Sequence, residues 1–170
     1  MSEIIYRLGK RKRPVNSRIV RVLYFFSNFP IIRKYILDLI KHFYKLPSSV
    51  TIYPGFHSSS SMIKVGENTG LGNLKIIAWA PVSIGERCSF SFDNIIITST
   101  HDLNDFSTVI GRPVTIGNHV WVTSNVTILP GVTIGDNTVI GAGSVVTHDI
   151  PSGVLAAGNP CKVIKKIDFK

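Results

Sequence analysis

The sequence predicts a mainly β fold, a parallel β-helix built from hexapeptide repeats and preceded by an α-helical extension. Three observations support this prediction: an unbroken six-residue period near the C-terminus, a looser period before it, and a basic N-terminal segment with helical periodicity. A period of six fits neither an α-helix, near 3.6, nor a single strand, at 2. It is typical of a triangular prism in which each hexapeptide forms one short strand and one turn.

The unbroken period runs from residue 116 to residue 150. Aliphatic residues recur every six positions, and small or β-branched residues follow them four positions later. The first row is Ile116, Val122, Ile128, Ile134, Ile140 and Val146, and the second is Val120, Val126, Val132, Thr138, Ser144 and Ile150. We expect the first row to point into the prism and the second to fill its corners. Glycines that follow inward residues, such as Gly117, are expected to take turn conformations that a Cβ would hinder.

The period continues toward the N-terminus less regularly. Val65, Leu71 and Ile77 keep the spacing, and one extra residue then shifts the phase to Ile84, Phe90 and Ile96. The repeat stops after Ile96, and residues 99–113 (STHDLNDFSTVIGRP) predict a loop that projects from one corner. Loops on rigid scaffolds often carry functional groups, so the His-Asp pair in this loop is the first candidate for chemistry.

The net charge of +9 lies entirely before residue 48, where eleven basic residues face two acidic ones. Pro30 separates two predicted amphipathic helices, residues 17–28 and 31–46. We therefore divide the chain into a basic amphipathic helical extension, residues 1–47, and a β-helix domain, residues 48–170. The domain includes the projecting loop 99–113 and a C-terminal tail, residues 156–170.

Two roles are open for the extension. Its helices either cap the open end of the prism or lie on an anionic membrane surface, and the two roles are compatible. Nucleic acid is not an expected partner, because no recognised binding motif accompanies the charge. No apolar run reaches the ~20 residues that span a bilayer, and no signal-peptide pattern is present. Two cysteines, Cys88 and Cys161, imply no disulfide framework. We expect a cytoplasmic protein, with peripheral contact at the inner face of the membrane as an open alternative.

From Ile84 to Ile167 the chain resembles the hexapeptide-repeat acyltransferases, in particular the maltose/galactoside and polysaccharide O-acetyltransferase branch. The motifs that carry the resemblance are IGERCSF, TSTHDLND, RPVTIGNHVWV, ILPGVTIGDNTVIGAGSVVTHDIP and AAGNPCKVIKKI. The resemblance implies a left-handed β-helix, a homotrimer with active sites between subunits, and transfer of an acetyl group from acetyl-CoA to a hydroxyl. No metal is expected.

The resemblance places the catalytic histidine at His101. A sugar hydroxyl is a weak nucleophile that must lose its proton as it attacks a thioester, and a neutral imidazole is suited to accept that proton. The imidazolium then returns the proton to the CoA thiolate, without an acyl-enzyme. Asp102 is a candidate for orienting the imidazole or binding an acceptor hydroxyl, and Asp93 is a second candidate for a direct role.

The same resemblance assigns the CoA contacts. Ser124, Ala142 and Thr147 match positions that meet the pantetheine arm, largely through backbone polar groups. Lys162 and Lys165 match basic positions near the nucleotide phosphates, where cationic side chains are expected. An ordinary solvated basic tail is the alternative for these lysines.

The acceptor side departs from the family pattern. Leu71 and Trp79 replace an asparagine and an aspartate that grip the sugar in relatives acting on free galactosides or maltose. This argues against a free disaccharide and favours a saccharide acceptor, often lipid-linked, in capsule, O-antigen or exopolysaccharide assembly. Trp79 and Trp121 are the candidate acceptor-binding aromatics, and packing between subunits is the alternative for Trp121.

Three other functions stay open at this point. N-acetylation of an amino sugar, often nucleotide-linked, would use the same histidine base. A zinc enzyme resembling the γ-class carbonic anhydrases would need three converging histidines, whereas only His101 and His119 fall on nearby coils. A non-catalytic β-helix scaffold is the third alternative.

Overall fold

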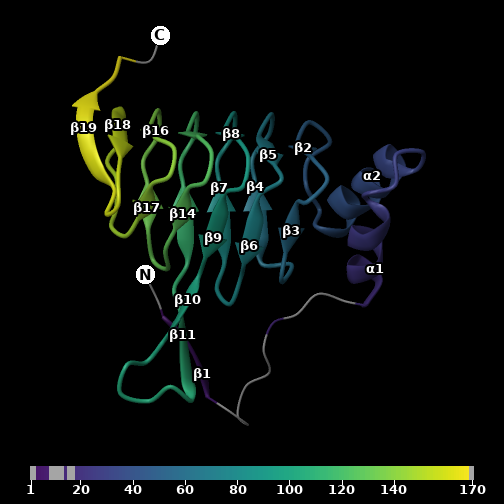
Figure 1. The fold of residues 1–170 in the computed structure, drawn as a ribbon, viewed down its shortest axis with the longest axis horizontal. Coiled ribbons are helices and arrows are strands. Elements are labelled where there is room, and N and C mark those ends of the chain that lie inside the picture. The colour runs from purple at the N-terminus through teal and green to yellow at the C-terminus, as the bar shows by residue number, and fades with distance from the viewer. Residues whose placement is uncertain (1–2, 8–13, 15–17, 169–170) are drawn as a thin grey trace.

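Stacked coils of short strands form the body of the molecule (Figure 1). The structure is a computed structural model and describes residues 3–7, 14 and 18–168. Three sheets run along the prism, and strands that neighbour each other within a sheet come from successive coils. All the strand pairs of these sheets are parallel except the last one, between β18 and β19.

The three sheets are named here by their number of strands. The four-stranded sheet holds β4 (Ile63–Val65), β7 (Val82–Ile84), β12 (Val114–Ile116) and β15 (Thr133–Ile134). The five-stranded sheet holds β3 (His57–Ser58), β6 (Lys75–Ile77), β9 (Ile95–Ile97), β14 (Thr127–Ile128) and β17 (Val145–Val146). The seven-stranded sheet holds β2 (Thr51–Ile52), β5 (Gly70–Gly72), β8 (Ser89–Phe90), β13 (Trp121–Val122), β16 (Val139–Ile140), β18 (Val154–Ala157) and β19 (Lys162–Lys166).

The core lies inside the prism and confirms both rows of the regular repeat. Every residue of the two rows between residues 116 and 150 is at most 4% exposed. Register explains why: equivalent inward residues pair in successive coils, as Phe90, Val122 and Ile140 do across β8, β13 and β16. A six-residue period therefore produces three parallel sheets around one continuous core.

The structure corrects the predicted phase of one early coil. Ile76 is fully buried, whereas the predicted inward residue Ile77 is 41% exposed. Ile76 pairs with the inward Ile96, and Ile77 pairs with Ile97. The coil containing β6 is irregular, and its inward residue comes five positions after Leu71 rather than six.

The structure also corrects the predicted role of most repeat glycines, although Gly72 does have a left-handed φ of +57°. Gly117 has no left-handed φ, and glycine is needed there because neighbouring coils approach closely. The same holds at Gly66, where a Cβ would lie 2.6 Å from the backbone nitrogen of Glu86. The left-handed φ values in the turns after Gly66 and Gly117 belong instead to Asn68 and His119, at +57° and +53°. Asparagine adopts this conformation more readily than most residues.

Two helices cover the first coil, at one end of the prism (Figure 1). They are α1 (Arg18–Phe26) and α2 (Arg33–Phe43), close to the predicted bounds, although residue 17 lies outside the described residues. Val20, Ile36 and Ile40 are buried in the core that continues into the coils. The helices therefore contact the open end of the prism, as the capping alternative expects.

A hydrogen-bond network fixes the helices to the coil. The hydroxyls of Tyr24 and Tyr44 lie 2.6 Å apart, and Tyr44 donates to the Ser58 carbonyl at 3.0 Å. The Ser58 N–H donates to the Tyr24 hydroxyl at 2.9 Å, and burial raises the pKa of Tyr24 above its usual value. Polar groups at this junction are thus paired, as buried polar groups must be.

Part of the extension is a strand rather than a helix. β1 (Ile4–Arg7) pairs antiparallel with β11 (Thr108–Gly111), which pairs antiparallel with β10 (Ser99–His101). The projecting loop is therefore a hairpin, and β1 completes it as a three-stranded sheet below the prism (Figure 1). The basic residues at 10–13 lie outside the described residues.

Candidate active site

The hairpin holds His101 at the end of a strand, outside the prism. Ile96 is the last inward aliphatic residue before the excursion, and Val114 is the first after it. In register, His101 lies opposite Val109, and Val109 lies opposite Tyr6 of β1. Backbone pairing on both sides of β11 thus fixes the strand that carries the predicted catalytic residue.

The imidazole of His101 has a defined hydrogen-bond partner. Its Nδ1 lies 2.8 Å from the carbonyl oxygen of Phe106. A carbonyl only accepts, so Nδ1 carries the hydrogen and, in the neutral ring, Nε2 keeps its lone pair. The side chain is exposed. This tautomer suits a base that takes a proton from a bound hydroxyl.

Carboxylates shape the hairpin turn. Asp105 accepts hydrogen bonds from the hydroxyls of Ser107 and Thr108, both at 2.6 Å, and from the Ser107 N–H at 3.0 Å. These bonds lower the pKa of Asp105 below its usual value, the Ser107 hydroxyl contributing most. Asp102 accepts from the Asn104 N–H at 2.8 Å. The ring of His101 is therefore oriented by the Phe106 carbonyl, and the Asp102 carboxylate is engaged within the turn.

Side chains also fix the root of the hairpin. Thr98 is fully buried, and its hydroxyl oxygen accepts from the backbone N–H groups of Trp79 and Ala80 at 2.8 and 2.9 Å. Tyr6 donates to the Trp79 carbonyl at 2.5 Å, and its ring meets the Trp79 ring edge-on at 5.1 Å. The structure thus places Trp79 against the N-terminal strand, at the base of the hairpin that carries His101.

The outer face of the seven-stranded sheet brings other predicted residues together. Trp121 pairs with Val139, Val139 with Leu155, and Leu155 with Lys165. Residues opposite each other in a sheet share a face, so Trp121 and Lys165 lie on the same outer surface. Trp121 is 48% exposed there, and its indole N–H donates to the Ser91 hydroxyl at 3.3 Å.

The predicted C-terminal tail is a strand of this sheet rather than a free tail. β19 pairs antiparallel with β18, and the register shifts between Leu155 and Ala156. Lys162 pairs with Ala157, which points the same way as Leu155. The irregularity therefore puts Lys162 and Lys165 on one face although they are three positions apart.

Three predicted residues stack along one edge of the prism, between the seven- and five-stranded sheets. Asp93, Ser124 and Ala142 occupy the turns after β8, β13 and β16. The Gly143 N–H donates to the Ser124 carbonyl at 3.0 Å, which holds two successive turns together. The Asp93 carboxylate accepts from the Asn73 amide at 2.9 Å.

The His101 hairpin leaves from a different edge. It connects β9 of the five-stranded sheet to β12 of the four-stranded sheet, and Thr147 follows β17 at the same edge. In a triangular prism this edge lies opposite the seven-stranded sheet. A single chain therefore does not bring His101 next to Trp121, Lys162 and Lys165.

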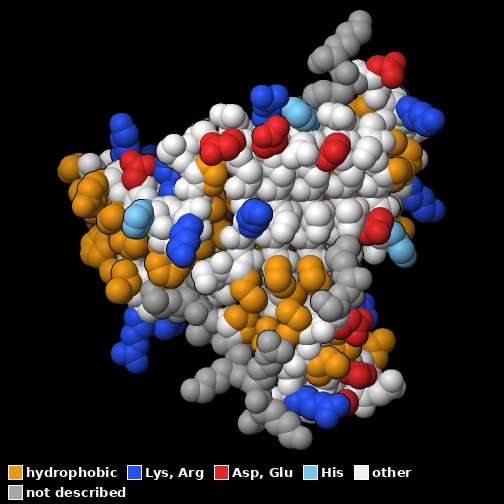
Figure 2. All heavy atoms as spheres, turned by 180° about the vertical axis from the view of Figure 1, so that it is seen from behind, with side chains coloured by type: hydrophobic (Ala, Val, Ile, Leu, Met, Phe, Trp, Pro, Cys, Tyr) orange, Lys and Arg blue, Asp and Glu red, His pale blue; other side chains and the backbone are white. Residues whose placement is uncertain are grey.

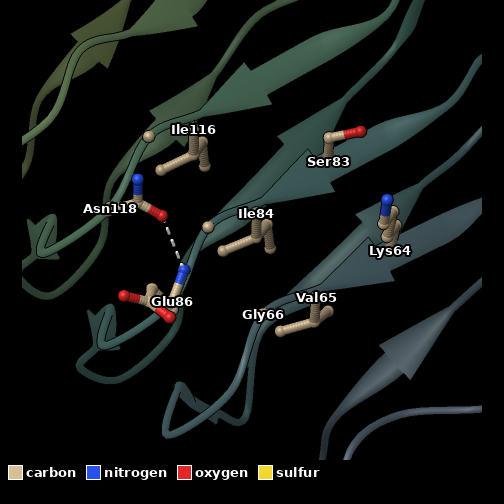
Figure 3. A pocket seen from close by; sticks show the side chains of 10 residues that line it. Lys64, Val65, Gly66, Ser83, Ile84, Glu86, Ile116 and Asn118 are labelled. Carbon is tan, nitrogen blue, oxygen red and sulfur yellow. Dashed lines mark hydrogen bonds between the residues drawn. The ribbon is translucent and has the colours of Figure 1, made fainter.

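A shallow pocket of about 450 Å³ lies elsewhere, on the four-stranded sheet and the turns that follow it (Figure 3). Lys64, Ser83, Glu86 and Asn118 belong to its lining, and Asn118 accepts a hydrogen bond from the Glu86 N–H at 3.0 Å. None of the predicted site residues lines it. Among the described residues, no three metal-ligating side chains gather in one place.

Comparisons with known proteins agree with this architecture. The family model described as "Bacterial transferase hexapeptide (six repeats)" matches residues 113–148. The galactoside O-acetyltransferase of Escherichia coli K12 is 45% identical over 121 residues, which is 68% of this chain and 59% of that protein. A maltose O-acetyltransferase from Clostridium difficile 630 superposes with a TM-score of 0.76 at 32% identity, covering 89% of this chain and 86% of that one.

The chain belongs to the hexapeptide-repeat transferase family. Its coils form the left-handed parallel β-helix of that family. A hexapeptide-repeat acetyltransferase from Vibrio cholerae O1 biovar eltor, crystallised with acetyl-CoA, superposes with a TM-score of 0.76 at 25% identity, covering 88% of this chain and 86% of that one. The alignment with the E. coli galactoside O-acetyltransferase spans less than two thirds of that enzyme.

Several groups around the His101 hairpin were not predicted from the sequence. The Phe106 carbonyl is a backbone group and leaves no compositional signal. Tyr6 reaches the site through a strand pairing more than 100 positions away. Asp105 followed by Ser107 and Thr108 is a local turn pattern that the sequence does offer.

Proposed function

We propose that the protein is an acetyl-CoA-dependent O-acetyltransferase that acts on a saccharide hydroxyl. The observation that carries the proposal is the orientation of His101: Nδ1 donates to the Phe106 carbonyl, which leaves Nε2 free to accept a proton. The relatives named as galactoside and maltose O-acetyltransferases, and the related structure with bound acetyl-CoA, support the choice of reaction.

The reaction follows from this geometry. Nε2 of His101 takes the proton of the acceptor hydroxyl while the hydroxyl oxygen attacks the thioester carbon. The tetrahedral intermediate collapses, the carbon–sulfur bond breaks, and the imidazolium gives its proton to the CoA sulfur. The products are the acetyl ester and free CoA, and the histidine returns to its starting state.

The proposed site is shared between copies of the chain in a homotrimer. His101 and the outer face of the seven-stranded sheet lie on opposite sides of one prism, so a neighbouring copy supplies the second half. Lys162 and Lys165 are exposed on that face, where they suit the phosphates of CoA. Ser124 and Ala142, on the adjacent edge, present turn backbone to the pantetheine arm.

The proposed acceptor is a larger or lipid-linked saccharide of surface-polysaccharide assembly. Leu71 is fully buried and cannot contact a sugar, and Trp79 packs against Tyr6. Neither position offers the polar side chain that a free disaccharide requires. Trp121 presents an exposed ring on which a sugar can stack.

The test is an acceptor panel with acetyl-CoA, in which thiol release and the mass of the acceptor are both followed. Lipid-linked oligosaccharides and polysaccharide fragments should gain one acetyl group as an ester labile to mild base. Free lactose and maltose should react more slowly. Acetylation confined to the nitrogen of nucleotide-linked amino sugars would replace the proposed reaction with N-acetylation. The absence of acceptor-dependent thiol release would contradict the proposal.

A further inference from the structure

Helix α1 has two apolar faces, of which only one is used by the fold. Val20 is fully buried, and Tyr24 on the same side bonds to the first coil. On the other side, Ile19, Val22 and Phe25 are 70%, 53% and 65% exposed. A surface helix normally presents polar residues on its solvent side, so capping the prism does not explain this second face.

The exposed apolar surface continues through the turn into α2. Phe26 and Phe29 are 39% and 47% exposed, and their rings lie 5.8 Å apart. Ile31 is 99% exposed. We call this surface the apolar tip; it consists of Ile19, Val22, Phe25, Phe26, Phe29, Ile31, Ile32 and Tyr35. Hydrophobic side chains gather over the helical end of the molecule, at the left of Figure 2.

Basic side chains border the apolar tip. Arg18 and Arg21 line a hollow of about 410 Å³ together with Val22 and Phe25. A second groove of about 420 Å³, between α2 and the first coil, is lined by basic residues of α2 and by Asp38. Its basic residues are Arg33, Lys34 and Lys41. Within the two helices Asp38 is the single acidic residue, so the border is strongly positive.

We propose that the apolar tip docks on an anionic lipid bilayer. Its aromatic and aliphatic side chains enter the boundary between headgroups and acyl chains, and the bordering arginines and lysines meet lipid phosphates. Within the described residues neither helix is long and apolar enough to cross a membrane, so the contact is peripheral. Phenylalanine clusters with a cationic border are typical of helices that lie in this interface.

Charge argues for a bilayer rather than a second copy of the chain. Two such tips facing each other would bring like charges together. The proposed catalytic contact between copies also lies along the side of the prism, whereas the apolar tip lies at its end (Figure 1). Binding is measured without turnover, so its failure would leave the proposed reaction untouched.

The test is co-sedimentation of the full chain with vesicles of phosphatidylglycerol and phosphatidylcholine, and with phosphatidylcholine alone. The variant Ile19→Gln/Phe25→Gln removes two exposed side chains of the tip, and Phe92→Gln/Ile164→Gln is the matched control. Phe92, in the turn after β8, is 58% exposed, and Ile164, on β19, is 61% exposed. We expect the tip variant to lose at least about tenfold in affinity for anionic vesicles and the control to bind as the parent does.

The basic residues that border the apolar tip are tested in the same co-sedimentation experiment. Arg18→Gln/Arg21→Gln should weaken binding to the anionic vesicles by about fivefold per charge, and added salt should reproduce the effect in the parent. Equal sedimentation of the parent and both variants would overturn the proposal. A tip variant that instead changes the oligomeric state in light scattering would also overturn it, since a second copy would then cover the tip.

Discussion

Replacement of His101 by alanine should lower kcat by about 10²–10⁴-fold, the range that a positioned general base contributes. The reason is that the acceptor hydroxyl then attacks without proton transfer to Nε2. The side chain is exposed, and its ring contacts Phe106 of the same hairpin, so the β-helix should remain intact. Thiol release at saturating acetyl-CoA and acceptor measures the effect on kcat.

His42→Ala is the control for this variant. His42 is an exposed histidine on α2, at the helical end of the molecule, and its removal should leave kcat unchanged. Circular dichroism and thermal unfolding of both variants should match the parent. If His101→Ala turns over at the parental rate, His101 is not the base and the proposed mechanism fails.

Thr98→Val should destabilise the protein by about 2–4 kcal/mol, because it keeps the shape of the side chain and removes a buried oxygen that accepts two backbone N–H bonds. For a chain of this size the midpoint of thermal unfolding should fall by roughly 5–15 °C. Denaturant unfolding measures the change in free energy. Thr98 directly precedes the hairpin that carries His101, so its loss should also disturb the position of His101. We therefore expect kcat to fall even at temperatures where the variant is still folded.

Thr98→Ser is the control that distinguishes the effect of losing the hydroxyl from the effect of losing the methyl group. It retains the oxygen that accepts from Trp79 and Ala80, so it should cost less than Thr98→Val and leave kcat close to the parental value. If valine is tolerated as well as serine at this position, the two hydrogen bonds to Thr98 do not hold the base of the hairpin.

The regular part of the fold was predictable because one physical rule governs it. From Ile116 to Ile150, residues six positions apart occupy equivalent places in the coil. Their burial therefore follows directly from their spacing in the sequence. The prediction failed at Ile77, where an irregular coil breaks the count, and at Gly117, where close packing rather than φ demands glycine. The strand β1 was missed because a four-residue strand has little local signal and depends on a distant partner.

For the candidate site, the sequence predicts side-chain identities but not their arrangement, and the roles of these residues stay predictions. The projecting loop and the choice of His101 follow from the interruption of the repeat and the family motif, whereas the hairpin pairing is seen only in the structure. The tautomer follows from a backbone carbonyl, which only the folded hairpin brings to Nδ1. The separation of His101 from Lys165 by the prism is likewise a property of the stacked coils. This separation is the reason for proposing that two copies of the chain form the site together.

We propose that acetyl transfer takes place at a site that joins His101 of one copy to the proposed CoA-binding face of another. It is tested by mixing two inactive forms, His101→Ala and Lys162→Glu/Lys165→Glu, under conditions that allow the trimers to reassemble, and measuring thiol release at low acetyl-CoA. No chain in the mixture carries both intact halves, yet about a quarter of the shared sites in randomly assembled trimers should be complete. We therefore predict recovery of about a quarter of the parental activity. A mixture no more active than the separate variants would contradict the shared site.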